Sequence, residues 1–391
     1  MRIGILTFHS AINYGAYLQA FSLSNMMQSA FPDDEVEIVD YTAPKEARRK
    51  AYIVLRNLKH HGIKGAWSEL NRIRIFMKAQ KHLSLSPKHF CMKRLEHLYE
   101  YIEERYDVLI IGSDAVFNWN QTNFPTAYIP EYRFSVPVYT YAASVHGLRF
   151  YEADKAVIRK CGEAFERMRC IGVRDDCSAH FVKYCAPDAK TVHCCDPTLF
   201  IDTSQVWELG CGVVERAKKE YKFSLNSKYI VIMAPDSALA AAVADRYRGE
   251  YKIVSVFVKN RHSDIYMDDL NPFEWAVVLR NAALVVTSYF HGTLLALVQG
   301  TPVLSVDYSE YSDLQYESKL KDLMVRRLSL PEFYIEQKDV NSLVESDAWA
   351  KRTDLLLSGV HDRKIAEAIS QERANIQQFV ERINSEIRCK Q

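Results

Sequence analysis

The sequence lacks the patterns of a membrane-spanning or disulfide-bonded protein. No apolar stretch approaches the roughly 20 residues of a transmembrane helix. The N-terminal MRIGILTFHS lacks the layout of a signal peptide and predicts a first β-strand instead. Nine cysteines are scattered, none of them as Cys-x-x-Cys. This odd number and the adjacent Cys194-Cys195 argue against a disulfide framework and favour a reducing cytoplasm.

Metal-ligand clusters and a charge imbalance are also missing. His193, Cys194 and Cys195 come nearest to a zinc site, but neighbours on a strand point to opposite faces. No group of carboxylates has ligand-like spacing either, so we expect no bound metal. With 50 Lys and Arg residues against 49 Asp and Glu, the net charge of +1 gives no sign of a nucleic-acid partner.

At 391 residues the chain is too long for one typical core, so we expect two domains. Two successive series of buried strands and helices predict an α/β protein with two doubly wound Rossmann-like domains facing a cleft. We place the N-terminal domain at residues 1–210, the C-terminal domain at 225–360 and an amphipathic helix at 361–391, with a charged linker at 204–227. The main predicted strands span residues 3–6, 36–39, 106–111, 137–143, 171–173, 229–233, 253–258, 284–286 and 303–306.

A basic helical insertion at about residues 45–100 interrupts the first series. Between residues 43 and 86 the only acids are Glu46 and Glu69, while Lys and Arg residues recur and alternate with apolar ones. We therefore predict helices with one apolar and one basic face. Two interpretations stay open: a solvated helical face, or docking to an anionic membrane surface or a lipid-diphosphate acceptor. The second would place the protein peripherally at the inner face of the membrane.

The most informative stretch runs from Leu284 to Asp307, LVVTSYFHGTLLALVQGTPVLSVD. Its apolar start predicts a buried parallel strand, residues 293–299 predict a short helix ending at Gly300, and Pro302 leads into the next strand. Between strand and helix lies the turn Ser288-Tyr289-Phe290-His291-Gly292-Thr293.

This turn suits an anionic ligand. Open parallel sheets bind ligands outside the carboxyl ends of their strands, and the first turn of a helix presents unpaired N–H groups. Gly292 would let a ligand approach the backbone. A histidine side chain can act as acid or base near neutral pH, so His291 is a candidate for either role. The alternative is a capping or core histidine packed beside Phe290.

Polar residues follow other predicted strands too. Asn13 and Gly15 lie in the loop after the first strand, and Gly112-Ser113-Asp114 and Arg174 follow later strands. Each could face a ligand. The structural alternatives are turn chemistry for Asn13 and Gly15, helix capping for Asp114, and pairing of Arg174 with a neighbouring acid.

Six blocks in this order resemble the polysaccharide pyruvyl transferase family. They are Asn13-Tyr14-Gly15-Ala16 with Leu18-Gln19-Ala20, Gly112-Ser113-Asp114, Tyr141-Ala142-Ala143-Ser144, Val173-Arg174-Asp175, Asp196-Pro197-Thr198-Leu199 and Ser288 to Thr293. The resemblance implies a glycosyltransferase-B-like fold. It also implies transfer of an enolpyruvyl group from phosphoenolpyruvate to a sugar of a cell-surface polysaccharide or its lipid-linked precursor, forming a pyruvate ketal. Phosphoenolpyruvate is then the donor substrate, and no cofactor is expected.

One position departs from the family pattern. The resemblance makes His291 the catalytic histidine, but Tyr289 stands where characterised members usually have an arginine that holds the phosphoenolpyruvate anion. Losing one charge-assisted hydrogen bond would cost about 1.5–3 kcal/mol, or roughly one to two decades in affinity. Another cation must then substitute, and we expect Arg174, Lys319 or Lys321 to do so.

We predict that His291, as imidazolium, protonates the enol methylene or supports the departing phosphate, and that Asp114 is the base for the acceptor hydroxyl. The predicted substrate-binding residues are Asn13, Tyr14, Gly15, Gly112, Ser113, Arg174, Ser288, Tyr289, Gly292, Thr293 and Lys319. Two other functions stay open. One is a nucleotide-sugar-dependent glycosyltransferase, whose diphosphate would suit the same helix start. The other is a non-catalytic relative that binds a glycan or a lipid carrier.

Overall fold

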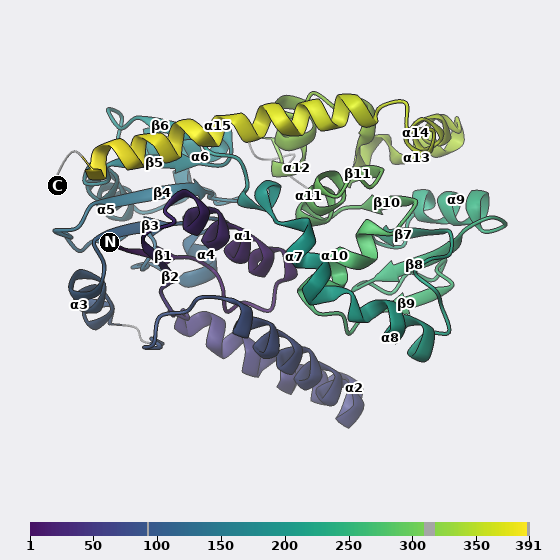
Figure 1. The fold of residues 1–391 in the computed structure, drawn as a ribbon, viewed down its shortest axis with the longest axis horizontal. Coiled ribbons are helices and arrows are strands. Elements are labelled where there is room, and N and C mark those ends of the chain that lie inside the picture. The colour runs from purple at the N-terminus through teal and green to yellow at the C-terminus, as the bar shows by residue number, and fades with distance from the viewer. Residues whose placement is uncertain (92–93, 309–316, 389–391) are drawn as a thin grey trace. The chain divides into compact units, whose positions relative to one another are not determined.

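The computed structural model describes residues 1–91, 94–308 and 317–388. The chain divides into two compact units (Figure 1). Among the described residues, the first contains Met1–Phe200 together with those from Arg373 onward, and the second contains those from Ile201 to Glu372. Within the described ranges, no helix combines the length and the apolarity needed to cross a bilayer.

The first unit is built on a six-stranded parallel sheet with the order β2-β1-β3-β4-β5-β6. Its strands are β1 (Arg2–Leu6), β2 (Glu35–Ile38), β3 (Val108–Ile111), β4 (Val138–Ala143), β5 (Cys170–Val173) and β6 (Thr191–His193). All four residues of β3 are buried, as expected for a strand covered by helices on both faces. The helices of this unit include α1 (Tyr14–Ala30), α2 (Pro44–Ala79), α3 (Glu96–Arg105), α4 (Trp119–Thr122), α5 (Lys155–Glu166) and α6 (Asp176–Cys185).

The second unit has its own six-stranded parallel sheet, with the order β12-β11-β10-β7-β8-β9. Its strands are β7 (Tyr229–Met233), β8 (Lys252–Val256), β9 (Ile265–Met267), β10 (Leu284–Thr287), β11 (Val303–Asp307) and β12 (Tyr334–Glu336). Its helices include α7 (Thr203–Gly210), α8 (Gly212–Glu220), α9 (Ala238–Tyr247), α10 (Pro272–Arg280), α11 (Phe290–Val298), α12 (Lys319–Lys321), α13 (Val340–Glu345) and α14 (Ala348–Leu357). The predicted class of two doubly wound α/β sheets is therefore confirmed.

The predicted linker is wrong. Residues 204–227 contain most of α7 and all of α8, and both helices belong to the second unit. Asp202 starts α7 by accepting hydrogen bonds from the amides of Ser204 and Gln205 at 2.8 and 3.1 Å. Val206 and Val213 are buried, so the charged residues of the segment mark the solvent faces of amphipathic helices.

The predicted C-terminal amphipathic helix is confirmed as α15 (Asp362–Arg388), drawn in yellow in Figure 1. Its buried residues include Ile369, Ile376 and Ile383. From Arg373 onward it packs on the first unit, where the Phe379 and Tyr141 ring centroids lie 5.1 Å apart. The end of the chain thus completes the core of the unit in which the chain begins.

Candidate functional site

The carboxyl edge of the second sheet holds the point at which strand order reverses, between β7 and β10. Doubly wound sheets bind ligands outside such a point. Each of the two strands leads into a helix. Ser237 caps α9 by accepting a hydrogen bond from the Ala240 amide at 3.3 Å, whereas Tyr289 at the start of α11 provides no side-chain cap. Of these two helices, α11 therefore offers the more open first turn to an anion.

The start of α11 corrects the predicted helix boundary. The helix begins one turn earlier than Thr293, because β10 ends at Thr287, whose hydroxyl accepts a hydrogen bond from the Tyr289 amide at 3.0 Å. The Thr293 amide already donates to the Tyr289 carbonyl at 3.0 Å, and its hydroxyl lies 2.8 Å from that of buried Ser305. An anion at this end would therefore bind the amides of the preceding turn, up to Gly292.

His291 lies in this first turn with its side chain largely enclosed. The residue is 8% exposed, and its ring meets the Phe290 ring edge-on with centroids 5.3 Å apart. Packing against Phe290 matches the alternative predicted for this histidine, but the location at the ligand-binding edge matches the functional prediction. Ser288 is half-buried and Tyr289 is 39% exposed. These two residues therefore form most of the surface of the turn.

Gly292 is buried, and its lack of a side chain serves the packing of the turn, while the approach of a ligand to its backbone stays a prediction. A Cβ atom at this position would lie 2.9 Å from the Thr287 hydroxyl oxygen. The absence of a side chain thus lets the first turn of α11 sit close to the end of β10. This packing role was not evident from the sequence, which suggested only that a ligand could approach the backbone here.

Lys319 comes to the same edge from the segment that follows β11. Its Nζ atom lies over the Phe290 ring, 5.1 Å from the centroid. The Lys319 ammonium group and the His291 imidazole therefore both contact the Phe290 ring. Cation–π contacts of this kind hold the end of a flexible lysine in place.

Buried Asp307, at the carboxyl end of β11, fixes the chain next to Lys319. The Ser318 hydroxyl donates a hydrogen bond to the Asp307 carboxylate and accepts one from the Lys321 amide at 3.0 Å. The Tyr334 hydroxyl donates to the same carboxylate at 2.8 Å. Asp307 thus anchors Ser318, the residue directly before Lys319 in the chain.

In the first sheet the strand order reverses between β1 and β3, where the Gly112-Ser113-Asp114 loop lies. A Cβ atom on Gly112 would lie 2.1 Å from the Tyr141 carbonyl oxygen, and the residue has a φ of +128°, so only glycine fits there. Ser113 is fully buried. Asp114, with a side chain 13% exposed, is the member of this loop that reaches the surface.

Arg174 is the buried centre of an ion-pair network. The residue is 4% exposed, and its Nη1 atom lies 3.2 Å from Asp196 and 3.7 Å from Asp114. Its Nε atom lies 3.8 Å from Asp175. Burial by itself would lower the pKa of the guanidinium, but the three carboxylates outweigh this effect and raise the pKa. Arg174 therefore pairs with neighbouring acids, which was the structural alternative to binding an anionic ligand.

The block Asn13-Tyr14-Gly15 does not form the predicted loop but starts α1. The Asn13 side-chain oxygen accepts hydrogen bonds from the amides of Gly15 and Ala16 at 3.0 and 3.2 Å, so Asn13 is a helix N-cap. The Tyr14 ring packs edge-on against Phe76 with centroids 4.6 Å apart. The contacts of Asn13 and Tyr14 support the fold, and substrate binding by this block stays a prediction.

A family model for polysaccharide pyruvyl transferases matches residues 13–310, which is more than half of the chain. The matched region includes the first helix, the Gly112-Ser113-Asp114 loop and the turn with His291. The chain belongs to the polysaccharide pyruvyl transferase family. Membership in this family, which the six blocks of sequence predicted, is thereby confirmed. Membership in this family supports a function as a transferase that modifies glycans.

Solved structures share the fold of this pyruvyl transferase family member at low sequence identity. The UDP-GlcNAc 2-epimerase from Neisseria meningitidis, bound to UDP-GlcNAc, has a TM-score of 0.56 at 10% identity, covering 97% of this chain and 100% of that one. Anabaena Alr3699/HepE in complex with UDP has a TM-score of 0.50 at 11% identity, covering 98% and 100%. No curated protein matches the chain. Such identities establish the fold alone, and the glycosyltransferase-B-like class is confirmed.

The structure ranks the three cations that were expected to replace the family arginine at Tyr289. Arg174 is enclosed by carboxylates in the first unit, and the Lys321 ammonium group lies 2.7 and 3.5 Å from two glutamates. Lys319 lies beside the ring that packs on His291. Burial raises the pKa of the Tyr289 hydroxyl, so at neutral pH this residue is an uncharged donor. By its position next to the ring that contacts His291, Lys319 is the best placed of the three.

A pocket of about 360 Å³ at the carboxyl edge of the first sheet was not predicted. It is lined by Trp119, Asn120, Gly147, Leu148, Arg149, Glu152 and Ala153. The loops after β3 and β4 form it, and the Asn118 side-chain amide joins them by donating to the His146 carbonyl at 3.0 Å. An aromatic ring beside a few polar groups is typical of small-molecule sites. The only sign in the sequence was that both loops follow predicted strands.

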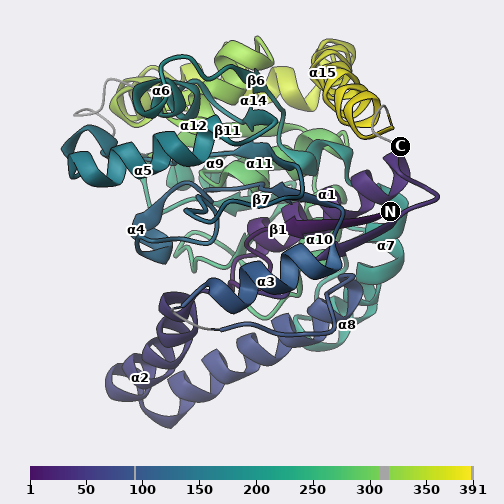
Figure 2. The same ribbon diagram turned by 90° about the vertical axis from the view of Figure 1, so that its left-hand side faces the viewer.

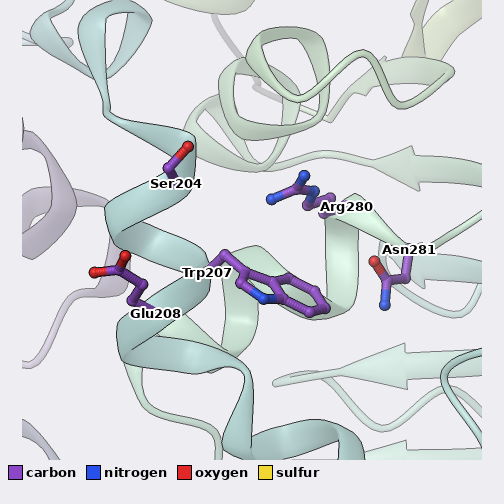
Figure 3. Close-up of a pocket in the computed structure, with 5 residues that line it drawn as sticks. All are labelled: Ser204, Trp207, Glu208, Arg280 and Asn281. Atoms are coloured by element: carbon purple, nitrogen blue, oxygen red, sulfur yellow. The ribbon is translucent and has the colours of Figure 1, made fainter.

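Another pocket, of about 350 Å³, lies at the opposite edge of the second sheet (Figure 3). It is lined by Ser204, Trp207, Glu208, Arg280 and Asn281. The Arg280 guanidinium lies 5.2 Å from the Trp207 ring centroid, and Asn281 ends α10 just before β10 begins. Because doubly wound sheets bind ligands at the other ends of their strands, we do not assign the transfer reaction to this pocket.

Proposed function

We propose that this protein transfers an enolpyruvyl group from phosphoenolpyruvate to a sugar of a cell-surface polysaccharide or of its lipid-linked precursor, and closes a pyruvate ketal. Family membership supports a transferase that acts on glycans. The observation that carries the choice of donor is the meeting of three features at the first turn of α11. These are His291, an uncapped helix start and the ammonium group of Lys319.

The donor's phosphate or carboxylate binds the amides of the first turn, with Lys319 supplying the positive charge. Tyr289, 39% exposed on the same turn, adds a neutral hydroxyl donor. A hydrogen bond to a charged group contributes about 1.5–3 kcal/mol, so the loss of the Lys319 charge should weaken donor binding by roughly one to two decades.

His291 is the general acid in this proposal. As imidazolium it protonates the methylene carbon of phosphoenolpyruvate, which becomes a methyl group and leaves an oxocarbenium-like carbon. One acceptor hydroxyl attacks this carbon and releases its proton. A second hydroxyl then displaces inorganic phosphate to close the ketal. A positioned general acid contributes about 10²- to 10⁴-fold. Asp114 is partly exposed on the first unit. Its role as the base that takes the proton of the first hydroxyl stays a prediction.

Two lysines in α12 allow a matched test of the donor site. Calorimetry with phosphoenolpyruvate should show 10- to 100-fold weaker binding to Lys319→Met. Lys321→Met should bind like the wild type, because Lys321 pairs with Glu317 and Glu336. Equal binding by both variants and the wild type would remove Lys319 from the donor site.

His291→Gln tests catalysis separately from binding. This variant should still bind phosphoenolpyruvate, but phosphate release with nucleotide-linked and polyprenyl-diphosphate-linked sugars as acceptors should fall at least 100-fold. Unchanged phosphate release would exclude His291 as the acid. Absence of turnover in the wild type, despite intact donor and glycan binding, would favour a non-catalytic relative.

A nucleotide-sugar-dependent glycosyltransferase is the second proposal, because the uncapped start of α11 suits a diphosphate equally well. The solved epimerase and HepE structures with the same fold hold UDP-GlcNAc and UDP. Thermal shift measurements with phosphoenolpyruvate and with UDP-sugars, added separately, distinguish the two donors. Stabilisation by the UDP-sugar alone would overturn the pyruvyl transfer proposal.

A further inference from the structure

Helix α2 of the first unit is a helical hairpin rather than one straight rod. It breaks at Gly62, whose φ of +64° and ψ of −161° lie outside the helical region. The Asn57 side-chain amide donates to Glu69 at 3.4 Å, although residues twelve apart in a straight helix are about 18 Å apart. A Cβ atom on Gly65 would lie 2.9 Å from the Asn57 carbonyl oxygen, which shows how closely the two arms approach. Figures 1 and 2 show the two helical arms of α2 lying side by side and joined by a turn.

One side of the hairpin packs against the rest of the first unit. The Phe76 ring packs on Tyr14, and the Tyr17 hydroxyl donates to the Ala79 carbonyl. At the other end of α2, the Lys45 ammonium group donates to the Asn120 carbonyl in α4. Both ends are thus fixed, while the turn between them extends away.

The other side exposes an unusual number of apolar side chains. Of the twelve large hydrophobic residues that are exposed in the described part of the chain, seven belong to α2. They are Tyr52, Leu55, Leu58, Ile63, Trp67, Leu70 and Met77. Ile63 and Trp67, next to the tip, are 80% and 73% exposed. Residues 63, 67, 70 and 77 fall on one helical face, so the second arm has an apolar stripe that no part of the described chain covers.

The charge of the hairpin indicates which kind of surface would fit this stripe. Residues 44–79 contain ten Lys and Arg residues but only two acids, and one of these, Glu69, is buried and paired with Arg72 at 2.8 Å. The rest of the chain has 40 basic residues against 47 acidic ones. If a second copy of the chain covered this face, two hairpins with a net charge of +8 each would face one another. Their repulsion disfavours self-association through this face. An anionic bilayer matches both the apolar stripe and the positive charge.

We propose that the α2 hairpin docks on an anionic membrane, with Ile63 and Trp67 inserted at the acyl boundary and Lys59 and Lys64 at the headgroups. Trp is favoured at this depth because its ring is apolar and its N–H is polar. This docking rests on the proposed function and extends it. A protein bound to the membrane would act on the lipid-linked form of the acceptor. The first arm begins beside α4, because Lys45 donates a hydrogen bond to Asn120. Trp119 and Asn120 of α4 also line the pocket at the carboxyl edge of the first sheet.

Vesicle co-sedimentation of the full chain tests the docking. Vesicles with equal parts phosphatidylglycerol and phosphatidylcholine should bind the protein, vesicles of phosphatidylcholine alone should bind it much more weakly, and binding should fall as salt rises. The double variant Ile63→Ser/Trp67→Ser should partition roughly tenfold or more weakly. The control Leu355→Ser/Val360→Ser changes two exposed apolar residues of the second unit and should bind like the wild type.

Thermal unfolding of both double variants should match that of the wild type, because the changed side chains are exposed. Equal binding to both kinds of vesicle, or binding that the tip variant does not lower, would overturn the proposal. So would a wild-type dimer in sedimentation velocity that the tip variant dissociates. Phosphoenolpyruvate binding is measured without vesicles, so failure of the docking and failure of the donor assignment are distinguishable.

Discussion

Replacing Arg174 by methionine tests whether this arginine serves the fold or a ligand. Methionine keeps much of the side-chain length but leaves three carboxylates without their shared cation. Asp196, whose side chain is 1% exposed, loses a partner at 3.2 Å. Removing one member of a buried ion pair costs about 3–5 kcal/mol. Asp114 and Asp175, with side chains 13% and 10% exposed, should add little because water reaches them.

The assay is thermal unfolding followed by circular dichroism. For a unit of about 200 residues, each kcal/mol lowers Tm by roughly 2–4 °C, so Arg174→Met should lower the Tm of the first unit by about 6–20 °C. The control is Arg159→Met, which removes an exposed pair with Glu163 at 2.5 Å, where the side chains are 68% and 48% exposed. Exposed pairs contribute about 0–1 kcal/mol, so this Tm should move little.

A double variant sharpens the result. In Arg174→Met/Asp196→Asn one uncompensated buried charge is gone, while Asp196→Asn keeps a side-chain oxygen for the Thr198 amide, which donates to it at 2.9 Å. Part of the lost Tm should return. The reasoning is refuted if Arg174→Met unfolds at the temperature of the Arg159→Met control and binds phosphoenolpyruvate more weakly. Arg174 would then act on the donor.

Two further outcomes follow from the structure. Asp307→Asn should weaken phosphoenolpyruvate binding several-fold in the wild-type background but not in Lys319→Met, since Asp307 acts by positioning the segment that carries Lys319. Burial would raise the pKa of Asp40, but hydrogen bonds from two histidines outweigh this and lower it. The carboxylate therefore stabilises the fold above its unfolded pKa of about 3.9, and this contribution is lost as the pH falls through the lower folded pKa. Asp40→Asn should flatten this part of the curve of unfolding free energy against pH.

Nine of the twelve strands in the described residues were predictable, because runs of apolar residues have few other stable locations. The three that were missed, β6, β9 and β12, are each only three residues long. Residues 229–233 form β7 as predicted, and all five are buried. The same reasoning located the turn with His291 at the carboxyl end of a buried strand. It also located the Gly112-Ser113-Asp114 loop, although only the structure shows that Gly112 must avoid a carbonyl oxygen.

Helix starts and side-chain roles were less predictable, since each depends on a contact that spacing does not show. Asn13 looked like a loop residue until its side chain was seen to accept amide hydrogen bonds. The segment 204–227 looked like a linker because its charges outnumber the buried Val206 and Val213. Arg174 pairs with Asp196, 22 residues further along the chain, and no local pattern distinguishes that pairing from an anion clamp.

A substrate anion needs a positive charge close to it in the folded protein. That charge need not come from the position in the sequence where the family usually has arginine. Tyr289 leaves the expected position uncharged, while Asp307 and Ser318 hold Lys319 over the ring beside His291. The proposed replacement of the arginine by Lys319 is not equivalent. An arginine binds a carboxylate or phosphate with two parallel hydrogen bonds, whereas a lysine is a point charge on a flexible stem. Donor selection should therefore depend more on the backbone amides of α11 than it does where an arginine holds the anion.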